Sequence, residues 1–448
     1  MDNPASEFGL DRAQIEALVE GALASARQKG CTQAEAGASL GTGLSVTVRK
    51  GSVETLEHQR DRSFAVTVYH GQRKGSASTS DLSAGAIDEA VAKASSIATF
   101  TAEDECTGLA DAELMASDPA DLSLDHPWSL TPEEAIDMAS DCERAGLESD
   151  ERISNSEGGS LHTGRSLRVY GNSHGFLGGY QCSSHSLSCV LVAGEGDAME
   201  RDYWYSSGRD PASLESAADI GRKAAERTLM RLGAEKISTR SVPVVFPPEL
   251  ARGLIGHFIS AVAGTSQYRQ ASFLLDAIGE EVFPSFVTLS ERPHLPGAAA
   301  SASFDNEGVA TRDRDLVSAG VLSSYVLSSY SARRLGLQTT GNAGGIHNLI
   351  VADGGRGRDE ILRSMGTGFL VNELMGQGVN GVTGDYSRGA SGFWIENGEI
   401  VRPVSEVTIA GNLREMFRNI VEIGNDVDER GAVRSGSILL SEMTIAGS

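Results

Sequence analysis

Cysteine is scarce in this sequence and is confined to its first half. The five cysteines are Cys31, Cys106, Cys142, Cys182 and Cys189, and no two of them have the CxxC spacing of a metal or redox motif. An odd number of scattered cysteines is not the pattern of a disulfide-stabilised secreted domain. We therefore expect a protein of a reducing compartment, the cytoplasm.

Positive charge and long apolar runs are also in short supply. Lys and Arg number 38 against 61 Asp and Glu, which gives a formal net charge of −23. Because a phosphate backbone repels such an acidic chain, we expect no nucleic-acid partner. No stretch reaches the roughly 18 apolar residues that a membrane span requires. Residues 1–7 contain neither the basic nor the apolar part of a secretion signal, so we expect no membrane association.

Glycine, by contrast, is abundant, with 52 of the 448 residues. We therefore expect many turns and close backbone contacts. Hydrophobic residues make up 40% of the chain and charged residues 22%, values that are typical of globular proteins. The length is sufficient for two or three domains of about 150 residues each.

The first half of the sequence contains the same order of patterns twice. Apolar residues recur at helical spacing over 15–26, and alternating runs typical of antiparallel strands, such as 64–69, follow them. The order of helix, strands and helix begins again at the capping box opened by Thr131. We predict an α+β domain over residues 1–235 with an internal repeat, 11–99 and 131–233.

After a polar linker the composition changes and short alternating runs replace the helical patterns. Asn397-Gly398 is a strong hairpin signal, a strand is predicted over 320–327, and a late helix is predicted over 410–420. We predict a mostly β, glycine-rich C-terminal domain over residues 236–448. The fold class of the whole chain is therefore α+β.

One helix, residues 248–264, organises this second half. It follows an apolar strand and has Pro248 at the first helical position, where a fixed φ and a missing donor are tolerated. Gly264 is predicted to end it. His257 lies on or beside the buried stripe, and a lone His in such a place is in most cases a core or groove residue.

This helix resembles the metal helix of the TldD/PmbA family of metalloproteases, also called modulators of DNA gyrase. One branch of that family carries HExxxH here, in which two His bind a divalent metal and the Glu activates a water. On this sequence the first His falls on Arg252, the Glu on Gly253 and the second His on His257. Arg has no lone pair to offer a metal, and Gly has no side chain. The Cys that the metal-binding branch uses near its C-terminus is also missing.

The resemblance is therefore to the other branch, PmbA or TldE, and it covers nearly the whole chain. It implies a subunit of a heteromeric metalloprotease that acts on small or unfolded peptides, in peptide-antibiotic maturation and antitoxin degradation. The TldD-type partner is then expected to supply zinc and the general base, while this chain has no catalytic residue, metal site or cofactor. The alternative is a stand-alone homodimer that binds peptides or acts as a scaffold without cleaving them.

A glycine-rich segment, residues 339–349, is the other candidate for a functional role. Glycines let a second backbone approach closely, and the apolar strand that follows can pair with an extended peptide. A tight turn between two strands explains the same pattern. The resemblance implies that this region lines the peptide cleft. His347 lacks neighbours at metal spacing and is predicted to be a rim or strand residue. The candidate peptide contacts are Thr340, Asn342, Gly344, Gly345 and Asn348.

Three further patterns carry no function in our interpretation. Residues 171–175 match GxSxG, but a strand pattern follows, so we predict a hairpin turn and not a nucleophile elbow. Residues 376–381 match GxGxxG without a following helix, which excludes a dinucleotide site. An acidic run without the spacing of a calcium loop is predicted to be a solvated loop, with Asp305, Glu307, Asp313 and Asp315.

Overall fold

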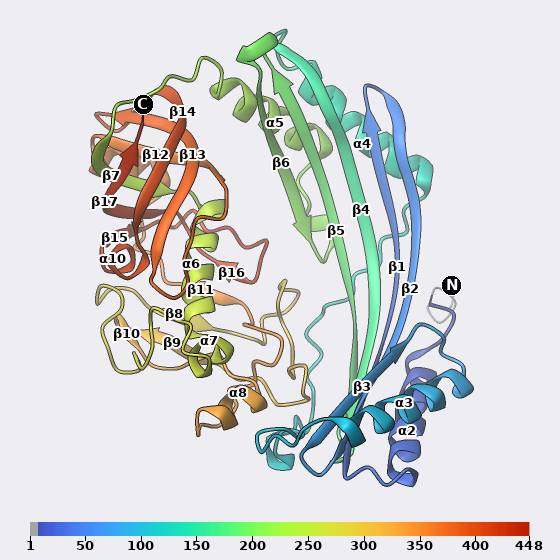
Figure 1. The fold of residues 1–448 in the computed structure, drawn as a ribbon. Helices are drawn as coiled ribbons and strands as arrows, with labels where there is room; N and C mark the ends of the chain where they lie inside the picture. The colour runs from blue at the N-terminus through green and yellow to red at the C-terminus, as the bar shows by residue number, and fades with distance from the viewer. Residues whose placement is uncertain (1–7, 448) are drawn as a thin grey trace.

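A long antiparallel sheet forms the first half of the protein in the computed structural model, which describes residues 8–447 (Figure 1). Its strand order is β3-β2-β1-β4-β5-β6, so β1 and β4, from the two predicted repeats, pair at its centre. The strands are much longer than the alternating runs of the sequence indicated. Their bounds are β1 (Gln33–Arg49), β2 (Ser52–His70), β3 (Arg73–Thr79), β4 (Ile153–Asn172), β5 (Leu177–Ala193) and β6 (Glu200–Gly208).

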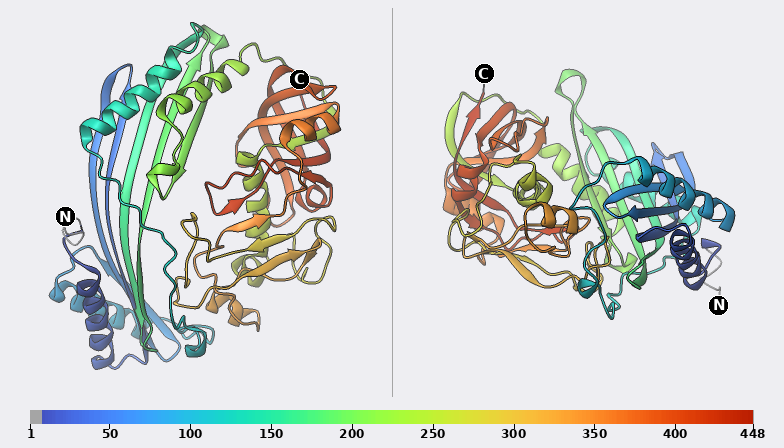
Figure 2. Two further views of the ribbon diagram at one scale, coloured as in Figure 1. Left: turned by 180° about the vertical axis from the view of Figure 1, so that it is seen from behind. Right: turned by 60° about the horizontal axis from the view of Figure 1, so that its bottom comes forward.

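Two pairs of helices cover one face of this sheet, at its opposite ends (Figure 2). On β1 the residues around Ala36 pack against the first pair, and those around Val46 pack against the second pair. Both sets have even numbers, so both cores lie on the same face. The duplication and the domain boundaries given above stay predictions. The helices are α2 (Arg12–Gln28), α3 (Ala84–Phe100), α4 (Pro132–Leu147) and α5 (Ala217–Met230).

Local capping signals decide where these helices begin. The capping box of α4 is confirmed, because Thr131 and Glu134 each accept a hydrogen bond from the other's backbone N–H. The helix expected directly after Asp210 starts later than predicted. Asp210 caps only a short 3₁₀ turn, and Ser216 caps α5.

The second half contains two further sheets. One has the strand order β14-β13-β12-β7-β17-β15 and the other β10-β9-β8-β11-β16. The α+β class is thereby confirmed. The strands of the first sheet are β7 (Arg240–Phe246), β12 (Gly368–Met375), β13 (Asp385–Glu396), β14 (Glu399–Asn412), β15 (Ile420–Ile423) and β17 (Ile438–Ala446). Those of the second are β8 (Leu289–Glu291), β9 (Arg314–Ser318), β10 (Val321–Leu322), β11 (Leu349–Val351) and β16 (Val433–Arg434).

Helix α6 (Pro248–Val262) belongs to the large core of this half. Phe258 is fully buried and contacts the rings of Phe283 and Phe417 edge to face. The prediction that Gly264 ends the helix is wrong, because the extended backbone of Ala263 does so. Gly264 instead opens the next helix, where a Cβ would lie 2.3 Å from Ser331 Oγ. The remaining helices are α7 (Gly264–Tyr268), α8 (Ser329–Arg334), α9 (Arg358–Met365) and α10 (Leu413–Arg418).

Of the other predictions for this half, the tight turn is confirmed, whereas a helix and a strand are shorter than predicted. The Asn397-Gly398 hairpin is confirmed, and both residues have the positive φ of a tight turn. The late helix is shorter than predicted, because residues 408–410 pair with β17 as part of β14. The strand expected over 320–327 is limited to β10. Within residues 8–447, no helix combines the length and the apolar character needed to cross a membrane.

The packing of α4 against α5 yields a stability prediction. At Gly221 of α5 a Cβ would lie 2.0 Å from the carbonyl oxygen of Cys142, whereas at Gly253 of α6 it would meet nothing within 4 Å. We expect Gly221→Ala to lower the free energy of unfolding by about 1–3 kcal/mol, the usual cost of overpacking. The matched Gly253→Ala should raise it by up to about 1 kcal/mol. Urea denaturation of both variants measures this, and equal effects would contradict the packing.

Candidate functional site

Arg252 lies on α6 at the first position of the metal pattern. Its Nη2 donates to the hydroxyl of Tyr205 on β6 at 3.0 Å, and its Nη1 lies 3.4 Å from Oδ2 of Asp428. Burial alone raises the pKa of Asp428, but hydrogen bonds from Arg430 and the charge of Arg252 outweigh it and hold the pKa below its usual range. Arg252 is therefore part of a charged junction between the two halves of the protein.

The other two positions of the pattern face outward from α6. Gly253 is exposed, and His257 is half-buried with its ring edge to face against Tyr386, at a centroid distance of 5.9 Å. Burial and the nearby charge of Arg388 both lower the pKa of His257. Arg388 also repels any cation at this imidazole.

A divalent metal does not fit this donor set. One imidazole is the only metal-binding side chain that the three positions provide, since the guanidinium of Arg252 has no lone pair for a metal and already binds Tyr205 and Asp428. Across residues 8–447, no three His, Cys, Asp or Glu side chains are grouped as metal ligands.

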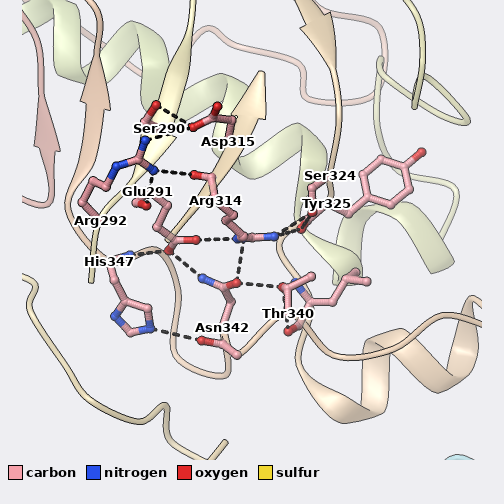
Figure 3. Close-up of polar contacts among 12 residues, drawn as sticks. Ser290, Glu291, Arg292, Arg314, Asp315, Ser324, Tyr325, Thr340, Asn342 and His347 are labelled. Carbon is pink, nitrogen blue, oxygen red and sulfur yellow. Dashed lines mark hydrogen bonds and ion pairs between the residues drawn. The ribbon is translucent and has the colours of Figure 1, made fainter. Parts of the chain in front are cut away.

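The glycine-rich segment is organised around the side chain of Asn342, which is 4% exposed (Figure 3). Its Nδ2 donates to Glu291 Oε1 at 2.7 Å and to the carbonyl of Gly345 at 3.0 Å. Its Oδ1 accepts from Arg314 Nη2 and from Thr340 Oγ1, both at 2.7 Å. Every hydrogen-bonding position of this amide is used inside the protein.

A buried ion pair supports the same loop. The side chains of Glu291 and Arg314 are 2% and 12% exposed and lie 2.7 Å apart. Glu291 Oε1 also accepts from the backbone N–H of His347, and the imidazole Nε2 of His347 lies 3.2 Å from the carbonyl of Gly341. His347 thus lies just before β11, in the loop and not in a strand.

Asn348 is fully buried and has a positive φ of 44°. Its Nδ2 donates to the carbonyl of Arg292 and to Ser301 Oγ, and its Oδ1 accepts from the N–H of Ala300. The side chains of Asn348, Asn342 and Thr340 therefore hold the loop, and contact between these residues and a peptide stays a prediction.

Gly344 and Gly345 differ from the other candidates. Gly344 is exposed and Gly345 is half-buried, and both have positive φ values, 107° and 119°. Contact between their backbone and a peptide stays a prediction.

The acidic run was not expected to contain a buried residue, yet Asp305 is 3% exposed. Its Oδ1 accepts from the N–H groups of Glu307 and Val309, and its Oδ2 accepts from the N–H of Ala343. Asp305 thus ties its own turn to the glycine-rich loop. Burial raises the pKa of Asp305 to about 7, against the effect of these donors.

The weak nucleotide and nucleophile motifs adopt the conformations expected of loops. Residues 172–175 form the turn between β4 and β5, where Ser173 Oγ accepts from the N–H of Ala34. No helix opens at residues 376–381, which connect β12 to β13. The predicted hairpin turn is confirmed, and no helix follows the GxGxxG pattern within the described residues.

Comparison with known proteins assigns the chain to a protein family. Models described as PmbA/TldA metallopeptidase domain 1, central domain and C-terminal domain match residues 34–98, 125–232 and 239–447. The chain belongs to the PmbA/TldD metallopeptidase family. Relatives in this family are named metalloproteases, so proteolysis is its activity at the family level.

Individual PmbA/TldD relatives cover nearly the whole chain. "Metalloprotease PmbA" from Escherichia coli is 50% identical over 99% of this chain and 98% of the relative. A solved structure from Bacteroides thetaiotaomicron, described as a modulator of DNA gyrase, is 30% identical, with a TM-score of 0.92 over 97% of this chain and 99% of that one. "Metalloprotease TldD homolog" from Buchnera aphidicola is 25% identical over 52% of this chain and 51% of the relative.

We expect Asp305 to make the stability of this PmbA/TldD protein depend on pH. Its folded pKa of about 7 lies above the unfolded value of about 3.9, so the native state binds more protons between these values. This group's contribution to the unfolding free energy should therefore fall as pH rises from about 4 to 7.

The variant Asp305→Asn tests this dependence. The amide nitrogen Nδ2 of the new Asn would face the N–H of Ala343, so that two donors would meet. We therefore expect the variant to lower the free energy of unfolding by about 1–3 kcal/mol at pH 5. The difference in unfolding free energy between the variant and the unsubstituted protein should be smaller at pH 7.5, because there the unsubstituted protein no longer gains stability from a protonated Asp305. Urea denaturation at both pH values measures it. An equal loss at the two values would show that Asp305 does not titrate in this window.

Proposed function

We propose that this chain is the PmbA-type, or TldE-type, subunit of a TldD/PmbA metallopeptidase complex in the cytoplasm. It takes part in the cleavage of small or unfolded peptides, as in peptide-antibiotic maturation or antitoxin degradation, and has no metal site of its own. The observation that carries the proposal is the engagement of Arg252 with Asp428 and Tyr205, at the position where a metal ligand would be needed.

The chemistry of peptide hydrolysis then requires a second subunit. Cleavage by a metalloprotease needs a Lewis acid and a general base, and α6 offers neither. A TldD-type subunit with zinc is the partner that the family makes available, since it contains relatives named TldD homologs. The 50% sequence identity to "Metalloprotease PmbA", over 99% of this chain, supports its assignment as the subunit that pairs with the TldD-type one.

The remaining features support a peptide as substrate and the cytoplasm as location. The exposed backbone of Gly344 can offer its N–H and C=O groups, and backbone groups recognise an extended chain regardless of its side chains. The five cysteines are all free thiols, as is usual in a reducing compartment.

Reconstitution tests the proposal directly. The purified chain alone should contain no stoichiometric zinc by elemental analysis and should cleave no unfolded peptide. Adding a TldD-type subunit should produce cleavage. Zinc bound to the isolated chain, or cleavage by it, would overturn the proposal. Specific peptide binding by a homodimer, with no gain on adding the TldD-type subunit, would favour the stand-alone binding protein.

The same complex tests the role of His257. Because its imidazole packs against Tyr386 and lies near the charge of Arg388, His257→Ala should change kcat/KM of the complex by less than about threefold. Ser260→Ala, at an exposed position one turn further along α6, is the matched control. A loss of 100-fold or more with normal assembly would assign His257 a part in catalysis.

A further inference from the structure

A cavity of about 600 Å³ lies where the end of β6 meets two loops of the C-terminal domain. The sheet side includes the last residues of β6 and the turn that follows, residues 206–210 with Ser213. The opposite side consists of residues 297–299 with Glu429, Arg430 and Arg434. None of these residues belongs to the metal pattern or to the glycine-rich loop.

Arg434 is the unusual residue of this cavity. Its side chain is only 16% exposed, yet its guanidinium donates no hydrogen bond to any of residues 8–447, and its Nε is buried without a partner. Its ion pair with Glu429 is long, 3.7 Å, and the side chain of Glu429 is 69% exposed. A buried donor without an acceptor costs free energy. A ligand that brings an acceptor to this guanidinium would therefore bind favourably.

A second arginine adds positive charge to the same walls. Arg209 donates to the carbonyl oxygens of Ser183, Ala298 and Ala299, at distances of 2.7–3.1 Å. These acceptors are neutral, and within the described part of the chain no carboxylate lies within ion-pair distance of Arg209. Its charge is therefore not neutralised locally.

Three carboxylates line the cavity, those of Asp210, Glu215 and Glu429, and all three residues are exposed, so water screens their charges. Arg430, by contrast, is 16% exposed and is already neutralised by Asp428. The interior of the cavity therefore favours an anion although the whole protein carries a net charge of −23.

We propose that this cavity binds the C-terminal carboxylate of a short peptide, with Arg434 as the main anion-binding residue. A guanidinium fork pairs with a carboxylate through two parallel hydrogen bonds. The volume is in the range of about 300–1,000 Å³ found for sites of small organic ligands, and it is larger than a lone phosphate requires. The hydroxyls of Ser184 and Ser207 supply polar groups for the peptide backbone.

This inference deepens the proposed function, on which it rests for the peptide as ligand class. The cavity and α6 border the same charged junction, because Asp428 contacts both Arg430 of the cavity and Arg252 of α6. Binding at Arg434 requires neither a metal nor a partner subunit. The inference can therefore be tested on the purified chain alone.

Isothermal titration calorimetry at pH 7.5 compares three probes: tetra-alanine with a free carboxylate, the same peptide with a C-terminal amide, and inorganic phosphate. We expect the free acid to bind at least about tenfold more tightly than the amide, because only the acid carries the charge. Arg434→Gln should abolish this difference. Arg358→Gln, at a 49% exposed position on α9, is the matched control and should preserve it.

Equal binding of acid and amide, or no binding of either, would overturn the proposal. Binding of phosphate without binding of the free acid would overturn the peptide assignment. The comparison of acid with amide needs no variant, so poor folding of Arg434→Gln cannot obscure it. If mixing with a TldD-type subunit gave no cleavage while the acid still bound preferentially, the proposed function would fail and the carboxylate site would remain.

Discussion

The buried carboxylate of Asp428 holds the junction between the two halves of the protein. It lies 2.8 Å from Arg430 and 3.4 Å from Arg252, and both arginines also bind Tyr205 of β6. The guanidinium of Arg430 lies over the rings of Tyr205 and Trp204, at 4.1 and 4.7 Å from their centroids. Breaking a buried pair of this kind typically costs about 3–5 kcal/mol, so these contacts constrain how α6 lies against the sheet.

At this junction Arg252, at the first position of the metal pattern, makes structural contacts. A metal-binding His at that position needs a free lone pair directed at the ion and an orienting hydrogen bond on its other nitrogen. Arg252 instead directs its donors at Tyr205 and Asp428, across the boundary between domains. The residue that cannot serve as the first metal ligand is thus the one that joins α6 to β6. The proposed carboxylate cavity borders this junction through Arg430, whose charge Asp428 has already neutralised.

The sequence predicted those features that depend on neighbouring residues. Helical spacing located α6 and placed His257 at the margin of its buried face, and the capping box located the start of α4. The partners of Arg252 were not predictable, because Asp428 and Tyr205 are 176 and 47 positions away in the sequence. Asp305 was misjudged for the same reason, since the N–H of Ala343 that it binds is 38 positions away. The shortened helix α10 likewise depends on pairing with β17, which no local pattern records.

The polar side chains of the glycine-rich loop have a structural role that composition does not record. A buried amide must satisfy its own hydrogen bonds. Asn342 meets this requirement with Glu291, Arg314, Thr340 and Gly345 and has no capacity left for a ligand. The proposed peptide contact at this loop would use the exposed backbone of Gly344, which the buried network holds in place. Backbone contacts do not discriminate between side chains, and this property suits the proposed role with unfolded peptides of varied sequence.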